Sequence, residues 1–207
     1  MSTNAEELAE QRDTIRLEAF SDAVIAIVAT LLVIEIHVPE VGEGESLWRE
    51  LGHLWPSYLA FFISFTIIGI MWINHHNLFK RISRVDHYLL VINLLLLLMI
   101  AFIPFTTALV AEHLTDDWNR TSALVYSGWF LLTAAVYNLF WWYAAHEGKL
   151  LSPGTSAGAI QAITRSYQLG LAGYAFAFLL AFVIPLASLI VLLLLAAFFI
   201  LPRASAG

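Results

Sequence analysis

The sequence contains no cysteine and unusually little charge. Only 13% of its 207 residues are Asp, Glu, Lys or Arg, whereas soluble domains carry about 25%. The lack of cysteine excludes disulfide bonds, thiolate metal ligands and a thiol nucleophile. The lack of charge excludes a soluble domain, because a chain with 60% hydrophobic residues could not cover itself with polar surface in water. We therefore expect an integral membrane protein.

Long apolar runs take the place of polar surface. Four of them, at about 20–38, 55–73, 88–110 and 122–145, are each close to the ~20 residues that cross a bilayer as a helix. The fifth, at about 166–201, is too long for one crossing, and Pro185 near its middle favours a break because proline lacks a backbone donor. We interpret this run as two short helices with a turn at about 184–188. One long kinked helix is the alternative.

These runs predict an all-α fold with six transmembrane helices, in a single domain over residues 1–207 with a short cytoplasmic N-terminal segment, 1–15. Lysine and arginine favour cytoplasmic loops, and eight of the ten lie on the side that holds both termini. Only Arg49 and Arg120 lie on the other side. We therefore expect a multi-pass cell-membrane protein with both termini in the cytoplasm. The eight basic residues are Arg12, Arg16, Lys80, Arg81, Arg84, Lys149, Arg165 and Arg203.

The loops on the opposite side are rich in acidic residues. Rings of such charge could concentrate cations at the mouth of a pore, or the residues could belong to ordinary solvated loops. The sequence leaves both interpretations open. The residues concerned are Glu40, Glu43, Glu45, Glu50, Glu112, Asp116 and Asp117.

The first apolar run is unusual because it begins with charged residues, Arg16 and Asp22 among them. An ionisable side chain inside a membrane helix is costly and marks a candidate functional site. Asp22 could bind an ion or hold helices together through hydrogen bonds, and we favour the second because polar partners occur at the same depth. Adjacent histidines point about 100° apart on a helix, so we expect no metal site. The partners are Asn74, His75, His76, Asn77 and Asn93.

One face of the same helix carries a stripe of mostly aliphatic residues. At 100° per residue, its members lie within about 60° of Ile27, whereas Asp22 lies about 140° away. Such a stripe could line a passage, or it could pack against lipid or a neighbouring helix, and periodicity alone favours packing. The stripe comprises Phe20, Ala23, Ile27, Thr30, Leu31 and Ile34.

Three motifs together resemble the transmembrane protein 175 family, which comprises lysosomal potassium channels and their prokaryotic homologues. They are Arg16-x-x-x-Phe20-Ser21-Asp22, the run 72–79 with the sequence Trp-Ile-Asn-His-His-Asn-Leu-Phe, and Asn93 followed by Phe-Ile-Pro-Phe at 102–105. The resemblance implies a homotetramer of six-span subunits in which the first helix of each subunit lines the pore.

The resemblance also implies residue roles. Ile27 would form the inner pore constriction, Leu31 and Ile34 would continue the apolar rings, and Thr30 would be linked to potassium preference. A second group would form an inter-helix network beside the pore, and we assign to it the motif residues Arg16, Phe20, Ser21, Asp22, Trp72, His75, His76 and Asn93.

The resulting prediction is a potassium-permeable cation channel with weak to moderate selectivity and a hydrophobic gate. Its expected partners are the lipid bilayer, further copies of the chain and monovalent cations, with no nucleic acid. We expect no cofactor apart from potassium ions in the pore. A secondary transporter or a proton-permeable membrane protein is the alternative. We expect no enzyme, because the histidines have no obvious nucleophile beside them.

Overall fold

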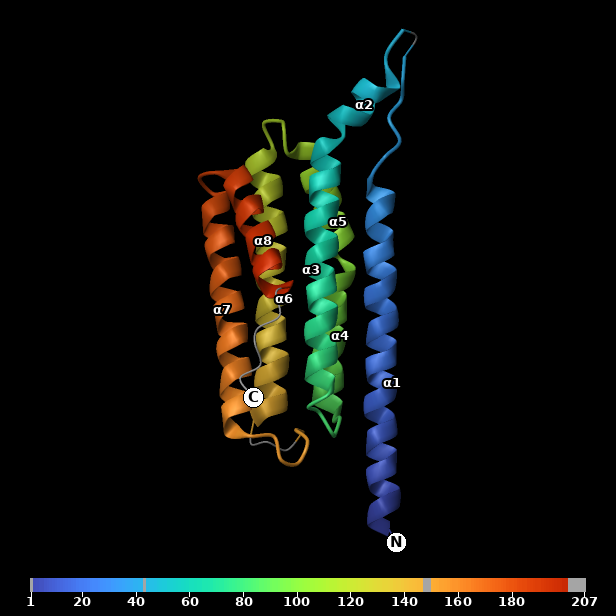
Figure 1. Ribbon diagram of the computed structural model, residues 1–207, viewed down its shortest axis with the longest axis vertical. Coiled ribbons are helices and arrows are strands. Elements are labelled where there is room, and N and C mark those ends of the chain that lie inside the picture. Colours follow the sequence, from blue (N-terminus) through green and yellow to red (C-terminus); the bar gives the residue numbers. More distant parts are fainter. Residues whose placement is uncertain (1, 43, 147–149, 201–207) are drawn as a thin grey trace.

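A computed structural model of the protein describes residues 2–42, 44–146 and 150–200, and this part of the chain is almost entirely helical. The long helices run side by side along one long axis, and the short α2 lies obliquely beyond one end of the bundle (Figure 1). In chain order they are α1 (Ser2–Leu31), the 3₁₀ helix η1 (Leu32–Glu35), α2 (Leu47–His53), α3 (Trp55–Phe79), α4 (His87–Ala101), α5 (Ile103–His113), α6 (Asn119–Ala145), α7 (Ala157–Ala181) and α8 (Pro185–Ile200).

Four segments of the described chain are long and apolar enough to cross a membrane: Arg12–Glu35, Trp55–Phe79, His87–His113 and Asn119–Ala145. Helix α7 is equally long, but Gln161, Arg165 and Gln168 make its first half more polar. Helix α8 is strongly apolar but shorter. The protein is therefore an all-helical membrane protein with four spans identified by length and composition.

The predicted break in the last apolar run is present. Helix α7 ends at Ala181, a turn follows, and Pro185 is the first residue of α8. The predicted turn at 184–188 was placed too late, because residues from Pro185 onward already form the first turn of α8. Proline suits that position, since the first residues of a helix have no intrahelical partner for their N–H groups. Helices α7 and α8 are antiparallel and pack against each other (Figure 1).

Two other predicted spans differ in detail from the structure. The run at 88–110 forms two helices, with Phe102 between them and Pro104 in the first turn of α5. The first run ends its α-helix at Leu31 and continues as the tighter η1 to Glu35, so residues 36–38 lie beyond the helix. In the other direction, the helix extends through the predicted N-terminal segment, starting at Ser2.

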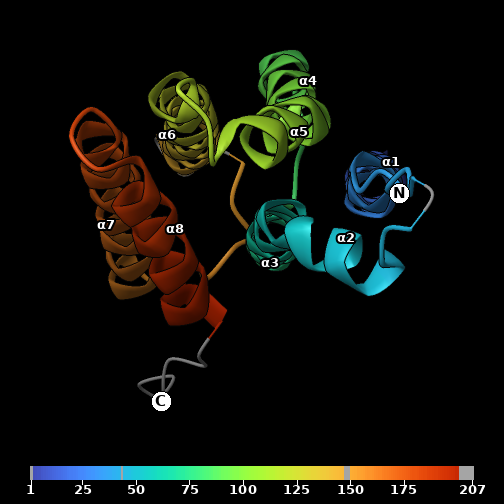
Figure 2. The same ribbon diagram turned by 90° about the horizontal axis from the view of Figure 1, so that it is seen from above.

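Seen along the bundle axis, α1 stands at one edge, α7 and α8 stand at the other, and α3 lies between them (Figure 2). Helix α1 packs against α3 and α4, while α6 packs against α4, α5 and α7. The core is built from fully buried side chains such as Ile67, Leu96, Ile100, Phe130 and Phe140. The position of α1 at the edge leaves its outer side without a neighbouring helix from the described part of the chain.

Candidate functional site

Helix α1 buries one narrow stripe of side chains. The buried residues are spaced three or four apart, which places them on one side of a helix. Ile25 is only 2% exposed and Leu32 is 0% exposed. This side faces α3 and α4 and fixes the rotation of α1 about its axis. The stripe comprises Thr14, Leu17, Ser21, Ile25, Val28 and Leu32.

The opposite side of α1 carries the predicted aliphatic stripe, and all six of its members are exposed. Ile27 is 58% exposed, Leu31 is 42% exposed and Ile34 is 66% exposed. Counting 100° per residue places Ile34 about 60° from Leu31. The segment from Leu32 to Glu35 is wound more tightly than an α-helix, so Ile34 lies closer in line with Leu31, the last residue of α1. A single chain thus leaves a row of mostly aliphatic side chains exposed on the side of the helix that faces away from its own core.

Thr30 brings an oxygen into this row between Ile27 and Leu31. Its hydroxyl donates to the backbone carbonyl of Ile27 over 2.8 Å, while the residue itself is exposed. A hydroxyl has one hydrogen and two lone pairs, and the hydrogen of Thr30 is already used in this bond. Towards the outer side of α1, the Thr30 oxygen can therefore only accept a hydrogen bond or contact a cation. It is therefore suited to face a cation or a water proton.

Two carboxylates of α1 contact the end of α3. The Trp72 indole N–H donates to Asp22 Oδ1 over 3.0 Å, and His76 Nδ1 lies 2.8 Å from Glu18 Oε1. The rings of Trp72 and His76 stack with their centroids 6.1 Å apart. Glu18 and Asp22 are one helical turn apart, so the two α3 rings hold one side of α1 at two successive levels.

A second, fully buried chain of hydrogen bonds joins α1, α3 and α4. Ser21 donates to the carbonyl of Leu17 over 2.9 Å, so its oxygen accepts from Asn93 Nδ2, also over 2.9 Å. The Asn93 carbonyl therefore points to His75 Nε2, 3.0 Å away. This direction requires the hydrogen on His75 Nε2, which leaves His75 Nδ1 as a buried acceptor without a partner among the described residues.

The structure brings together most of the predicted network but changes its membership. Arg16 is exposed and forms no hydrogen bond or ion pair with any described residue, and Phe20 lies on the outer side of α1. Asn74 and Asn77 are on another side of α3, where they line a cavity. Glu18 was missed. Its position four residues before Asp22, beside the buried stripe, was the signal that could have found it.

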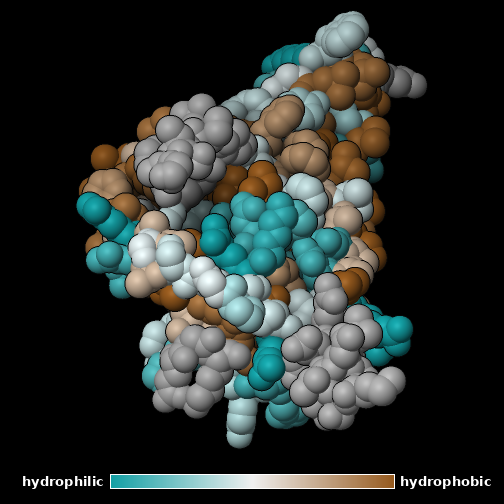
Figure 3. All heavy atoms as spheres, turned by 60° about the horizontal axis from the view of Figure 1, so that its bottom comes forward, coloured by the Kyte–Doolittle hydropathy of each residue, from teal (hydrophilic) through white to brown (hydrophobic). Residues whose placement is uncertain are grey.

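His75 and His76 contact different partners, and within the described residues no group of three or more histidine, aspartate or glutamate side chains could hold a metal ion. Seen from the end that holds the N-terminus, hydrophilic side chains gather in the middle of the face and hydrophobic ones flank them (Figure 3). The polar network lies towards the same end of α3, because His76 is in the last turn of that helix and His75 directly precedes it.

Comparisons with known proteins agree with the motifs. A family model described as the endosomal/lysosomal potassium channel TMEM175 matches residues 16–104. A potassium channel of Chamaesiphon minutus is 45% identical over 197 residues, which are 94% of this chain and 97% of that protein. An endosomal/lysosomal proton channel TMEM175 of Gallus gallus is 36% identical over 156 residues, which are 70% of this chain and 31% of that protein.

A solved structure extends the comparison to the fold. The crystal structure of a lysosomal potassium-selective channel TMEM175 homolog from Chamaesiphon minutus matches with a TM-score of 0.84 and 43% identity, over 91% of this chain and 97% of that one. These relatives are ion channels by name, not enzymes. The near-complete coverage at this identity shows that the chain belongs to the TMEM175 family.

Proposed function

We propose that this protein is a potassium-permeable cation channel in which four copies place α1 around a central pore. The observation that carries the proposal is the exposed row of Ile27, Thr30, Leu31 and Ile34, on the side of α1 that faces away from its own chain. One relative is named a potassium channel, and 97% of its length matches this chain. This similarity supports potassium as the permeant ion. A single α1 cannot enclose a passage, so the proposal requires a closed ring of subunits.

The proposed gate is hydrophobic. Four copies of Ile27 would meet at the pore axis, with Leu31 and Ile34 forming further apolar rings beyond them. Such a constriction gates by losing water, because its walls offer no hydrogen bonds in return. An ion must then shed part of its hydration, which costs less for potassium than for sodium. The Thr30 oxygens, free to accept, would offer partial compensation, so selectivity would be weak to moderate.

The polar network would act as a brace rather than as an ion site. Asp22 and Glu18 are both held by side chains of α3, and Ser21 is held through Asn93. These contacts lie on the other side of α1 from Ile27. They would therefore set the rotation of α1, and with it the direction in which the aliphatic row points.

The proposed topology has six spans in the cell membrane with both termini in the cytoplasm. Helices α7 and α8 supply the fifth and sixth spans. The 16 residues of α8 rise about 24 Å, most of the ~30 Å hydrocarbon core. The bias of basic residues supports the orientation, although Lys149 and Arg203 lie outside the described residues. A reporter fused to the C-terminus that was found outside the cell would refute this topology.

A second candidate function is proton permeation, favoured by the name of the related Gallus gallus channel. A transporter has less support, since the relatives compared are channels by name. Protons cross apolar constrictions through water chains, whereas potassium needs a wider hydrated path. The two functions can therefore be separated by measuring each ion in the absence of the other.

The test uses purified protein in liposomes loaded with potassium. A proton ionophore and a pH-sensitive dye report outward potassium flux, and the same vesicles loaded with sodium give the comparison. Vesicles prepared without potassium and without ionophore, with an imposed pH gradient, report proton flux alone. We expect potassium flux to exceed sodium flux. Absence of cation flux from assembled protein would refute the channel proposal, and proton flux without potassium flux would support the second candidate.

A further inference from the structure

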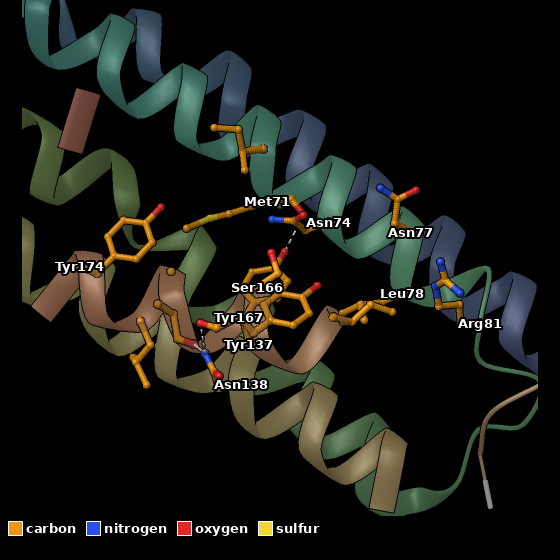
Figure 4. A pocket seen from close by; sticks show the side chains of 15 residues that line it. Met71, Asn74, Asn77, Leu78, Arg81, Tyr137, Asn138, Ser166, Tyr167 and Tyr174 are labelled. Atoms are coloured by element: carbon orange, nitrogen blue, oxygen red, sulfur yellow. Dashed lines mark hydrogen bonds between the residues drawn. The ribbon is translucent and has the colours of Figure 1, made fainter. Parts of the chain in front are cut away.

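A cavity of about 510 Å³ lies between α3, α6 and α7, on the side of α3 that faces away from α1 (Figure 4). Its volume is within the range of small-molecule binding sites. No residue of α8 lines it, although α8 packs against these same three helices. Helix α8 covers only part of the length of α7 (Figure 1), and the cavity occupies the seam that α8 does not fill.

The lining of the cavity changes from polar to apolar along its length. Arg81 and Asn77 lie at the end where α3 finishes, Asn74 follows, and Met71 and Tyr174 lie towards the middle of the bundle (Figure 4). Arg81 and Asn77 are exposed, whereas Tyr174 is buried. The helical rise from Ile70 to Phe79 is about 14 Å. The cavity therefore runs from the end of the bundle into the depth occupied by hydrocarbon.

The polar part of the lining is basic and rich in side-chain amides. Arg81 is its one charged member, and no carboxylate is among the described residues that line it. The Asn138 amide from α6 donates to the carbonyls of Ala134 and Tyr167, and Ser166 adds a hydroxyl from α7. Polar side chains inside a membrane bundle are costly unless they face a cavity, a partner or a ligand. Arg81, at the exposed mouth of the cavity, suits a phosphate, which its planar guanidinium can bind through two parallel hydrogen bonds.

We propose that this cavity binds an anionic phospholipid. The phosphate would lie at Arg81, the polar glycerol region beside Asn77 and Asn74, and the start of an acyl chain against Ile70 and Leu171. A cavity between membrane helices with a basic mouth is a recognised type of headgroup site. The site is separate from the α1 row, so lipid binding does not depend on the proposed channel activity.

The test measures lipid binding to the purified full-length protein in mild detergent. Phosphatidylglycerol is added in rising mole fraction, and both the melting temperature and the number of lipids retained in native mass spectrometry are recorded. We expect saturable stabilisation by phosphatidylglycerol, weaker stabilisation by phosphatidylcholine, and none by inorganic phosphate. Equal stabilisation by inorganic phosphate would overturn the proposal of a lipid ligand and would indicate a site for a free anion.

Two variants and one matched control locate the site. Arg81→Gln should raise the half-saturating mole fraction of phosphatidylglycerol about fivefold, the effect of one basic residue near a lipid surface. Lys80→Gln removes the same charge from the neighbouring residue, which does not line the cavity, and should leave binding unchanged. Asn77→Trp keeps Arg81 but narrows the exposed mouth, and should also weaken binding.

Three results would overturn the proposal. If Arg81→Gln and Lys80→Gln weakened phosphatidylglycerol binding equally, the lipid would be attracted by the overall surface charge and not by the cavity. Equal half-saturation for phosphatidylglycerol and phosphatidylcholine would show that the headgroup charge is not recognised. Undiminished phosphatidylglycerol binding by Asn77→Trp would place the lipid elsewhere, and this result stands even if Arg81→Gln does not fold.

Discussion

The indole nitrogen of Trp72 lies 3.0 Å from a carboxylate oxygen of Asp22, so the end of α3 holds α1 by the side opposite to Ile27. Ile27 itself is 58% exposed in the single chain. One helix therefore has a polar side that anchors it to its own subunit and an aliphatic side that requires another environment.

Ile27→Asn is expected to raise cation flux and to lower the discrimination between potassium and sodium. An amide would offer polar contacts where the wild-type ring offers none, and a barrier lower by about 1 kcal/mol raises flux about fivefold. The measurement is potassium and sodium flux in liposomes. Unchanged flux and unchanged selectivity would remove Ile27 as the constriction.

Val24→Asn is the matched control for that experiment. Val24 is about 60° from Ile27 on the helix and is partly buried against the core of its own chain. The substitution should lower the melting temperature, because it places an amide against apolar neighbours. The selectivity of the protein that still assembles should stay at the wild-type value.

Asp22→Asn is expected to weaken the attachment of α1 and to leave ion selectivity unchanged. Because the site is partly open, the expected loss is about 1 kcal/mol, below the usual range for a hydrogen bond to a charged group. Unfolding measurements on Asp22→Asn, Trp72→Phe and the double variant should show that the two losses are not additive. If the Asp22→Asn channel assembled normally but lost its potassium preference, Asp22 would act on the ion, and its proposed role in holding α1 against α3 would be wrong.

Arg16→Ala distinguishes folding of the subunit from assembly of the ring. Arg16 is exposed and has no partner among the described residues of its own chain. The substitution should therefore leave the melting temperature of the isolated subunit unchanged and reduce the fraction of tetramer seen in size-exclusion chromatography with light scattering. A lower subunit stability with normal assembly would show that Arg16 acts within one chain.

Asn93→Ala is expected to cause the largest loss of stability in the network, about 2–3 kcal/mol. It would leave the buried His75 Nε2 without its partner and remove one of the two hydrogen bonds of Ser21, and an unpaired buried polar group costs about 1–3 kcal/mol. Leu94→Ala changes the next residue, whose side chain is exposed, and serves as the control. Equal unfolding free energies for the two variants would refute the importance of the buried chain.

The loop between α5 and α6 should carry a pH-dependent contact. The hydrogen bond from His113 to Asp116 over 2.7 Å lowers the pKa of the Asp116 carboxyl below its ordinary 3.8. A carboxyl with a lowered pKa stabilises the folded loop above the unfolded pKa, and this contribution is lost as pH falls through the folded pKa. The Trp118 amide, which donates to Asp116 over 2.7 Å, should show an NMR shift with a midpoint below 3.8. A midpoint at or above that value would contradict the contact.

The sequence by itself determined the features that depend on local order along the chain. Apolar runs identified the membrane helices, because the bilayer thickness sets their length. Pro185 marked the break between α7 and α8, because a missing N–H acts at its own position. The stripe through Ile27 followed from the helical period alone, and every member is exposed on one side of α1.

The tertiary structure decided which polar residues meet. Asn74 and His75 are neighbours in the sequence, yet one lines the cavity and the other reaches Asn93. Glu18 takes a place in the network that the sequence suggested for Arg16. Helical spacing says which residues share a side, but not the rotation and separation of helices far apart in the chain. Those are set by packing along the whole bundle, which no local pattern contains.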